Sequence, residues 1–65
     1  MPRVNIEAER GRLGFTKEQM CQYLGVTGKT YNAYIRGATI PSGALVKLHE
    51  LTGKSVDYLL GLADQ

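Results

Sequence analysis

The stretch that decides the fold is KEQMCQYLGVTGKTYNAYIRG, residues 17–37. Apolar residues at helical spacing predict a helix over residues 17–24. The next three residues, Gly25 to Thr27, leave room only for a sharp turn before a second helix over residues 28–36. Two helices joined by so short a turn cross steeply, at roughly 90–120°. The small side chain of Cys21 lets them approach, and a glycine supplies the positive φ that the turn needs.

Three further helices are predicted from the residues that start and end helices. Glycines that can cap a helix C-terminus are Gly14, Gly25, Gly37, Gly53 and Gly61. Hydroxyl side chains that can cap an N-terminus are Thr16, which forms a capping box with Gln19, and Thr27, Ser42 and Ser55. The predicted helices cover residues 4–13, 17–24, 28–36, 43–52 and 56–60. No alternating strand pattern is present, so the expected fold class is all-α, a compact five-helix bundle.

Each predicted helix has apolar residues that a common core could bury. The expected core residues are Met20, Cys21, Leu24, Tyr31, Tyr34, Leu45, Val46, Leu48, Leu51, Val56, Leu59 and Leu60. The Tyr31 hydroxyl then needs a hydrogen-bond partner or a path to water.

Size and composition bound the class of protein. The chain of 65 residues suffices for one domain, residues 1–65. The single cysteine excludes an intrachain disulfide, and small secreted domains usually carry several, so we expect a reducing, cytoplasmic environment. No apolar run approaches the ~18 residues of a membrane span. Charged residues interrupt residues 1–15, where a signal peptide would need an apolar centre.

Positive charge is concentrated in the first part of the chain. The net charge is +2, yet residues 1–37 carry six Lys or Arg against three Glu, and residues 38–65 carry two Lys against three acidic residues. This asymmetry has two interpretations: one surface that faces an anion, or ordinary solvated charges that happen to be distributed in this way. The best candidate for a surface that faces an anion is the predicted helix over residues 28–36, whose polar side has the width that a DNA major groove accepts.

Candidate contacts to DNA follow from this helix and its surroundings. The candidates for base contact are Gly28, Lys29, Asn32 and Ala33. Lys29 could bind guanine O6 and N7, hold a phosphate or remain solvated, and Asn32 could pair with adenine N6 and N7, hold a phosphate or face water. The candidates for phosphate contact are Lys17, Thr27, Thr30, Arg36 and Thr39.

A set of short motifs stands in order across nearly the whole chain. They are Gly14-Phe15-Thr16, Leu24-Gly25-Val26-Thr27, Thr30 with Tyr34, Arg36-Gly37, Pro41-Ser42 and Ser55-Val56-Asp57-Tyr58-Leu59-Leu60-Gly61. This ordered set resembles the lambda-repressor-like helix-turn-helix family, also called the Cro or xenobiotic-response-element (XRE) type. The resemblance implies a five-helix fold, a recognition helix that begins near Thr27, and usually a homodimer on DNA.

The chain departs from the family pattern at several positions. Lys17 stands where the family usually has Gln, and Gly28 stands where a polar side chain is common. The family often pairs an Arg of the first helix with a Glu late in the third. Arg10 is present, but Ile35 occupies the Glu position, so Arg10 needs another partner or solvent. The segment between Gly37 and Leu45 is about one residue short, which affects its expected phosphate contacts.

A homodimer would place two recognition helices in successive major grooves, so the expected site is approximately palindromic double-stranded DNA. The expected dimer contacts are Val56, Tyr58, Leu59 and Leu62, because this end of the chain has more apolar residues than one short helix buries inward.

No catalytic set is recognisable, and no enzyme activity, cofactor, small-molecule substrate or membrane partner is expected. His49 stands alone, so no metal is expected either. The leading hypothesis is a sequence-specific DNA-binding transcriptional regulator, a phage or bacterial repressor. The alternatives are an antitoxin of the same fold that binds a toxin protein, and a helix-turn-helix protein-interaction module with a degraded DNA face.

Overall fold

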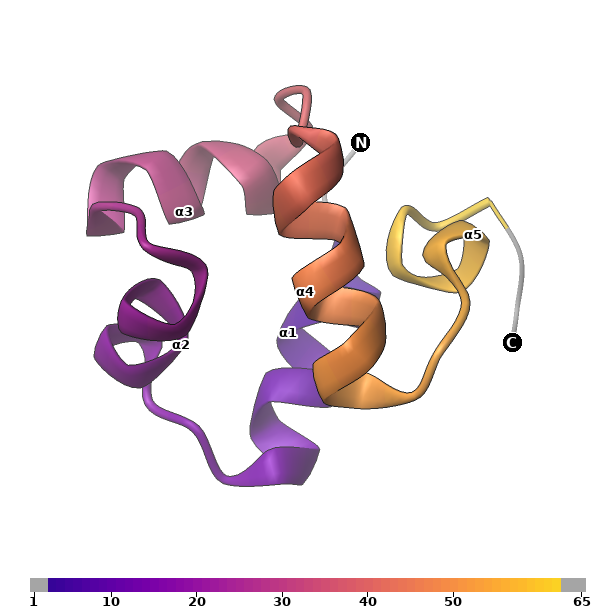
Figure 1. Cartoon of the computed structure of the whole chain (residues 1–65), viewed down its shortest axis with the longest axis horizontal. Helices are drawn as coiled ribbons and strands as arrows, with labels where there is room; N and C mark the ends of the chain where they lie inside the picture. Colours follow the sequence, from indigo (N-terminus) through magenta and orange to yellow (C-terminus); the bar gives the residue numbers. More distant parts are fainter. Residues whose placement is uncertain (1–2, 63–65) are drawn as a thin grey trace.

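The computed structural model describes residues 3–62, which form five α helices and no strand (Figure 1). The helices are α1 (Val4–Leu13), α2 (Lys17–Leu24), α3 (Gly28–Arg36), α4 (Ser42–Thr52) and α5 (Val56–Leu59). The first three have the predicted bounds, α4 begins one residue earlier than predicted, and α5 ends one residue earlier. Helices α2 and α3 meet at the tight turn on one side of the molecule, and α5 lies on the opposite side (Figure 1).

The predicted N-caps are confirmed at three of four helices. Thr16 accepts a hydrogen bond from the Gln19 backbone N–H at 3.0 Å, and the Gln19 side chain accepts from the Thr16 N–H at 2.9 Å, which completes the capping box. Thr27 and Ser55 cap α3 and α5 through the backbone N–H three residues later. These side chains satisfy helix donors that have no partner within their own helix.

The prediction of Ser42 as an N-cap is wrong. The N-cap residue of α4 is Pro41, whose carbonyl accepts a hydrogen bond from the Leu45 N–H at 3.1 Å. Ser42 is the first helical residue. The extended backbone at Pro41, with φ −58° and ψ 150°, suits the cap position. Proline fixes this φ without help from a side-chain hydrogen bond, so the serine is not needed as a cap.

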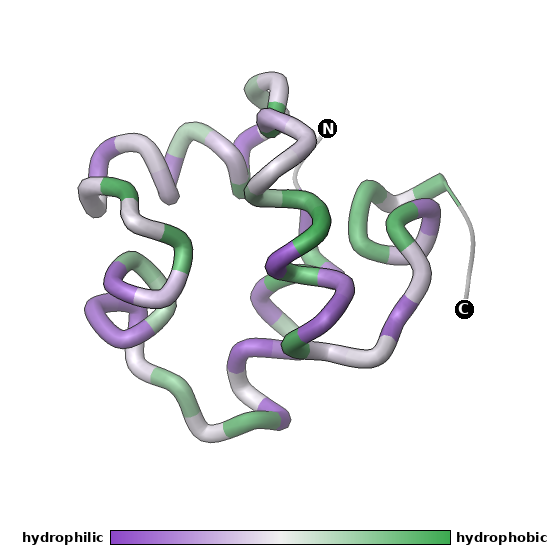
Figure 2. Tube along the Cα trace, viewed as in Figure 1, coloured by the Kyte–Doolittle hydropathy of each residue, from purple (hydrophilic) through white to green (hydrophobic). Residues whose placement is uncertain are grey.

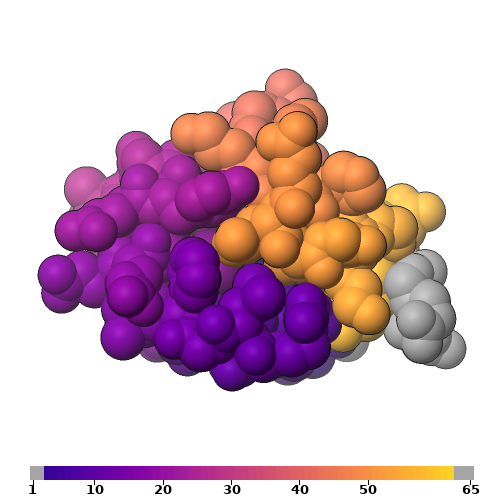
Figure 3. Space-filling view, turned by 60° about the horizontal axis from the view of Figure 1, so that its bottom comes forward, coloured from indigo at the N-terminus to yellow at the C-terminus, as the bar shows by residue number. Residues whose placement is uncertain are grey.

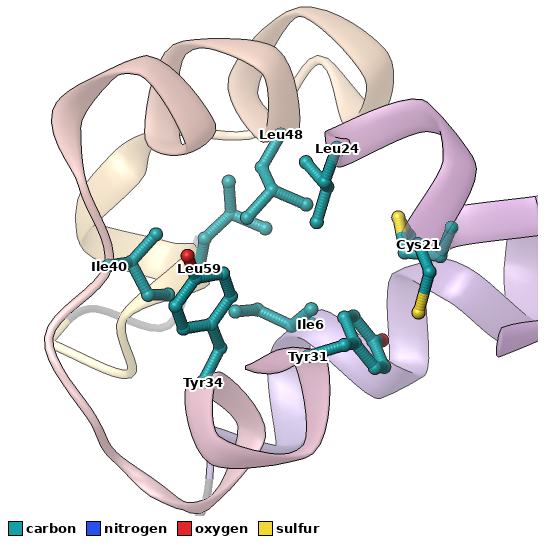
Figure 4. Close-up of a cluster of buried hydrophobic side chains, with 9 residues drawn as sticks. Ile6, Cys21, Leu24, Tyr31, Tyr34, Ile40, Leu48 and Leu59 are labelled. Carbon is teal, nitrogen blue, oxygen red and sulfur yellow. The ribbon is translucent and has the colours of Figure 1, made fainter. Parts of the chain in front are cut away.

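A core of nine buried residues holds the helices together. It consists of Ile6, Met20, Cys21, Leu24, Tyr31, Tyr34, Ile40, Leu48 and Leu59. Every helix contributes at least one of them, and their side chains converge between the helices (Figure 4). Hydrophobic and hydrophilic segments alternate along α4, as expected for a helix that buries one face (Figure 2).

Two expectations about apolar residues are wrong. Val46 was expected on the buried face of α4, but its side chain is 53% exposed, because Leu45 and Leu48 already direct the apolar face inward and Val46 lies beside it. The sequence predicts Leu59 both as a core residue and as a dimer contact, and only the first is correct: Leu59 is 0% exposed and belongs to the core. It therefore cannot contact a second copy in the folded monomer.

Helix α1 also buries a charged residue that the sequence patterns did not indicate. Glu9 is buried, and its carboxylate accepts from Arg12 at 2.8 Å and from the Tyr58 hydroxyl at 3.4 Å. The Arg12 guanidinium also donates to the Thr52 carbonyl at the end of α4. In the space-filling view α1 runs along the edge between the α2 region and the α4–α5 region (Figure 3). These hydrogen bonds tie α1 to the C-terminal half of the chain.

The longest helix of the described chain, α4, has 11 residues. No helix within residues 3–62 has the length and apolarity of a membrane span.

Candidate nucleic-acid interface

Helices α2 and α3 are joined by the short turn that the sequence predicts. Gly25 ends α2 in the left-handed region, with φ +72°. The Val26 N–H donates to the Cys21 carbonyl at 3.0 Å, which closes the end of α2 and turns the chain. Thr27 then starts α3 at once. Cys21 is buried in the core, and half-buried Val26 packs against the same core, so the turn joins α2 and α3 to it.

Helix α3 has two distinct faces. Tyr31 and Tyr34 point into the core, as predicted (Figure 4). Lys29, Asn32 and Arg36 are all exposed, and their spacing of three and four residues places them on one side of the helix. Of the remaining candidates for base contact, Gly28 is exposed and Ala33 is half-buried. The structure thus brings the predicted cations and amide together on a single outward face.

The candidate phosphate contacts are spread over α2, α3 and the following loop. Lys17 is exposed in the first turn of α2, and its charge lies close enough to Glu7 to help lower the pKa of that carboxyl. The Thr27 hydroxyl donates to the Thr30 hydroxyl at 3.1 Å, so these two side chains are brought together. Arg36 is exposed in the last turn of α3, and Thr39 is exposed in the loop before α4.

A hydrogen-bonded cluster of α1 side chains contacts the buried face of α3 through Tyr31. The buried Tyr31 hydroxyl donates to Glu7 Oε2 at 2.5 Å, and Arg10 donates to the same carboxylate at 2.9 Å. Arg10 also donates to the Phe15 carbonyl at 2.7 Å, so it has found partners in place of the missing glutamate at Ile35. Sequence patterns gave no sign of this role for Glu7, because its partners come together only in the folded chain.

The cluster shifts the acid–base properties of its members. The hydrogen bond from Arg10, aided by that from Tyr31, lowers the pKa of the Glu7 carboxyl below its ordinary value of 4.5 against the opposing effect of burial. Burial, together with the hydrogen bond to Glu7, raises the pKa of the Tyr31 phenol above its ordinary value of 10.0. At neutral pH the carboxylate is therefore charged and the phenol is neutral, which is the arrangement that the hydrogen bonds require.

The candidate dimer residues differ strongly in exposure. Leu62 is 74% exposed, whereas Val56 and Tyr58 are half-buried. The Tyr58 ring packs against the core, and the Lys54 ammonium lies 5.7 Å from its centroid. With Leu59 buried, the exposed apolar surface at this end is smaller than the sequence predicts.

No pocket is found in the part of the chain that the structure describes. No group of three or more His, Cys, Asp or Glu side chains is arranged there to hold a metal ion.

The tight turn between α2 and α3, the contact between these two helices and the exposed polar face of α3 define a helix-turn-helix protein. A family model described as helix-turn-helix matches residues 6–59. The chain belongs to this family, the lambda-repressor-like or XRE type, as the sequence motifs indicated. Family membership supports a DNA-binding transcription regulator and not, in general, an enzyme. Comparisons with curated proteins and with solved structures give no match.

Proposed function

We propose that this protein is a sequence-specific regulator that inserts α3 into the major groove of double-stranded DNA. The observation that carries the proposal is the outward face of α3, on which Lys29, Asn32 and Arg36 are exposed together while Tyr31 and Tyr34 anchor the opposite face. A helix of this kind fits the major groove, where each base pair presents a distinct set of donors and acceptors.

Within this proposal the exposed residues divide by position along α3. Lys29 and Asn32 read base edges from the first two turns, and Arg36 holds a phosphate from the last turn. Gly28 has no atom within 4 Å of the place where a Cβ would stand, so the bare backbone allows the start of α3 to approach the groove, beside half-buried Ala33. Lys17, Thr27, Thr30 and Thr39 surround this face as the further candidates for phosphate contact.

The regulator binds as a homodimer to an approximately palindromic site and acts as a phage or bacterial repressor. One recognition helix contacts few base pairs, and two-fold symmetry doubles the site by placing half-sites roughly 10 base pairs apart. Leu62, with Val56 and Tyr58, supplies the contact between copies. Sedimentation of the protein with a duplex that it selects from random DNA tests whether it binds as a dimer. One protein per site at saturation would exclude the dimer.

Lys29→Ala, with Lys47→Ala as its matched control, tests the function. Both variants lose one exposed positive charge on a helix, but Lys47 lies on α4 and is not among the candidate DNA or dimer contacts. A duplex selected from random DNA by the parent protein serves as the probe. Lys29→Ala should weaken binding by roughly 1–3 kcal/mol and relax the preference at one base pair, whereas Lys47→Ala should not.

Two results would contradict the proposal. Equal affinities of the two variants at every salt concentration would remove Lys29 from the interface. A parent protein that binds no duplex, even at low salt, would exclude DNA as the partner and favour the antitoxin or the protein-interaction module instead.

A further inference from the structure

Arg3, which precedes α1, binds the end of the recognition helix. Its backbone N–H donates to the Ile35 carbonyl at 2.6 Å. Its guanidinium donates through Nη1 to the carbonyls of Tyr34 and Ala38, both at 2.5 Å, and through Nη2 to that of Gly37 at 3.3 Å. A single residue thus holds four carbonyls of the segment in which α3 ends and the loop to α4 begins.

Two of these carbonyls, those of Tyr34 and Ile35, belong to the last turn of α3. The last four carbonyls of an α helix have no acceptor role within their own helix, and they form the negative end of the helix dipole. A guanidinium suits this place because it combines a fixed positive charge with a rigid, planar set of donors. Arg3 lies 31 to 35 residues away in sequence from the carbonyls that its guanidinium holds, so the contact is a tertiary one.

Arg3 adds a second link between the N-terminal part of the chain and α3. With Ile35 at the family's Glu position, Arg10 binds the Glu7 carboxylate and the Phe15 carbonyl. Glu7 holds α3 near its start, through Tyr31. Arg3 holds α3 at its end, so α1 and the residue before it fix both ends of the recognition helix.

We propose that Arg3 is a positioning residue that sets the orientation of the C-terminal half of α3 against DNA. This inference rests on the proposed function. The guanidinium is already bound to carbonyls, so Arg3 acts through the helix that it holds and not as a ligand of phosphate. Loss of Arg3 frees the segment that presents Arg36 and Thr39. The phosphate contacts of this segment fix the register in which Lys29 and Asn32 meet the bases, so their loss reduces discrimination between DNA sequences.

The test compares Arg3→Gln with Arg12→Gln in the full chain. Arg12 is a matched control because it also donates to the end of a helix, at the Thr52 carbonyl of α4, and its loss removes the same charge. The Arg12→Gln substitution also removes a hydrogen-bond partner of the buried Glu9. The control is therefore expected to lower the stability of the fold at least as much as Arg3→Gln does. Binding is measured to the duplex selected by the parent and to a mixed-sequence duplex, at a temperature where circular dichroism shows every variant folded.

Arg3→Gln should lower affinity for the selected duplex by about tenfold more than affinity for the mixed duplex, as expected when one charge-assisted anchor of a site is lost. Arg12→Gln should leave that ratio unchanged, because simple destabilisation weakens binding to both duplexes equally. The slope of log affinity against log salt should stay the same in Arg3→Gln. Arg3→Lys, which keeps the charge but not the planar set of donors, should discriminate less well than the parent.

Three results would overturn the inference. If the ratio of affinities for the selected and the mixed-sequence duplex were the same in Arg3→Gln and Arg12→Gln, Arg3 would have no positioning role. A salt slope reduced by about 0.9 would show that Arg3 binds a phosphate directly. If Arg3→Lys discriminated between the two duplexes as well as the parent does, a positive charge alone would hold the end of α3 and the planar set of donors would not be needed.

Hydrogen exchange separates this inference from the proposed function. The amides of Gly37 and Ala38, which donate to carbonyls of α3, should exchange faster in Arg3→Gln than in the parent or in Arg12→Gln, with no DNA present. A parent that binds no DNA would refute the proposed function, and unchanged exchange would refute the anchoring of α3 by Arg3.

Discussion

Tyr31→Phe should destabilise the protein through one hydrogen bond and leave its core packing intact. Tyr31 is 1% exposed, and its ring fills the space between α1, α2 and α3. Phenylalanine keeps that ring and removes only the hydroxyl that donates to Glu7 at 2.5 Å. The matched control is Tyr34→Phe, because the Tyr34 hydroxyl has no hydrogen-bond partner within residues 3–62 and its ring is also buried.

The size of the effect follows from the partners of Glu7. A hydrogen bond to a charged group contributes about 1.5–3 kcal/mol. The Glu7 side chain is 28% exposed and keeps Arg10, so water can replace the lost donor in part. We therefore expect a loss of about 1.5 kcal/mol at neutral pH for Tyr31→Phe, and less than about 0.5 kcal/mol for Tyr34→Phe.

The pH dependence of this loss has a definite sign. The pKa of Glu7 is lower in the folded protein than its ordinary value of 4.5, so the carboxylate stabilises the fold above pH 4.5. That stabilisation is lost as the pH falls through the folded-state pKa. Because Tyr31 is one cause of the lowered pKa, the difference between parent and Tyr31→Phe should be constant near neutrality and should shrink in acid.

Urea unfolding of the parent, Tyr31→Phe, Glu7→Gln and the double variant, followed by circular dichroism, measures the effect. The double-mutant cycle isolates the coupling between Tyr31 and Glu7. A coupling energy near zero at neutral pH, or a loss that does not change between neutral and acid pH, would refute the reasoning. A loss equal to that of Tyr34→Phe would do the same.

Further predictions concern glycines and ionisation. Gly25→Val places a β-branched residue at φ +72° and should cost about 1–3 kcal/mol, and an unchanged melting midpoint would show that the turn lies elsewhere. Gly11→Ala, within α1 and with no atom within 4 Å of the new Cβ, should instead stabilise by about 0.5–1 kcal/mol, and any loss in a melt would contradict the helical geometry there. In an alkaline spectrophotometric titration Tyr31 should ionise above the ordinary tyrosine value of 10.0, because burial raises its pKa, and Tyr31→Phe should remove that step.

The helices were predictable because their signals are local. The Thr16 capping box involves residues three positions apart, and Gly25 ends α2 through contacts with the preceding turn. Such features depend on the chain within a few residues, so a sequence pattern contains them. The two faces of α3 follow from helical periodicity for the same reason, and the exposed positions of Lys29, Asn32 and Arg36 agree with the sequence prediction.

The parts that were missed depend on residues far apart in the chain. A short apolar run does not reveal which of its members meets the core, so the pattern predicts Val46 as buried and leaves Leu59 in both the core and the dimer surface. The anchoring of α3 by Arg3 joins residues more than 30 positions apart, and its acceptors are backbone carbonyls, which every residue type has. Only the fold brings these groups together.

The position of Leu59 has a consequence for synthesis in the cell. The last helix closes a core that begins with Ile6, and the Asn5 amide donates to the Tyr58 carbonyl 53 residues away. A nascent chain that has already formed the α2–α3 pair therefore still exposes apolar side chains until α5 is made. We expect a truncated translation product that ends before α5 to be recognised by chaperones and proteases. Such a product would be degraded and would not compete with the folded regulator for DNA. Only chains that include α5 would then contribute to the cellular amount of regulator.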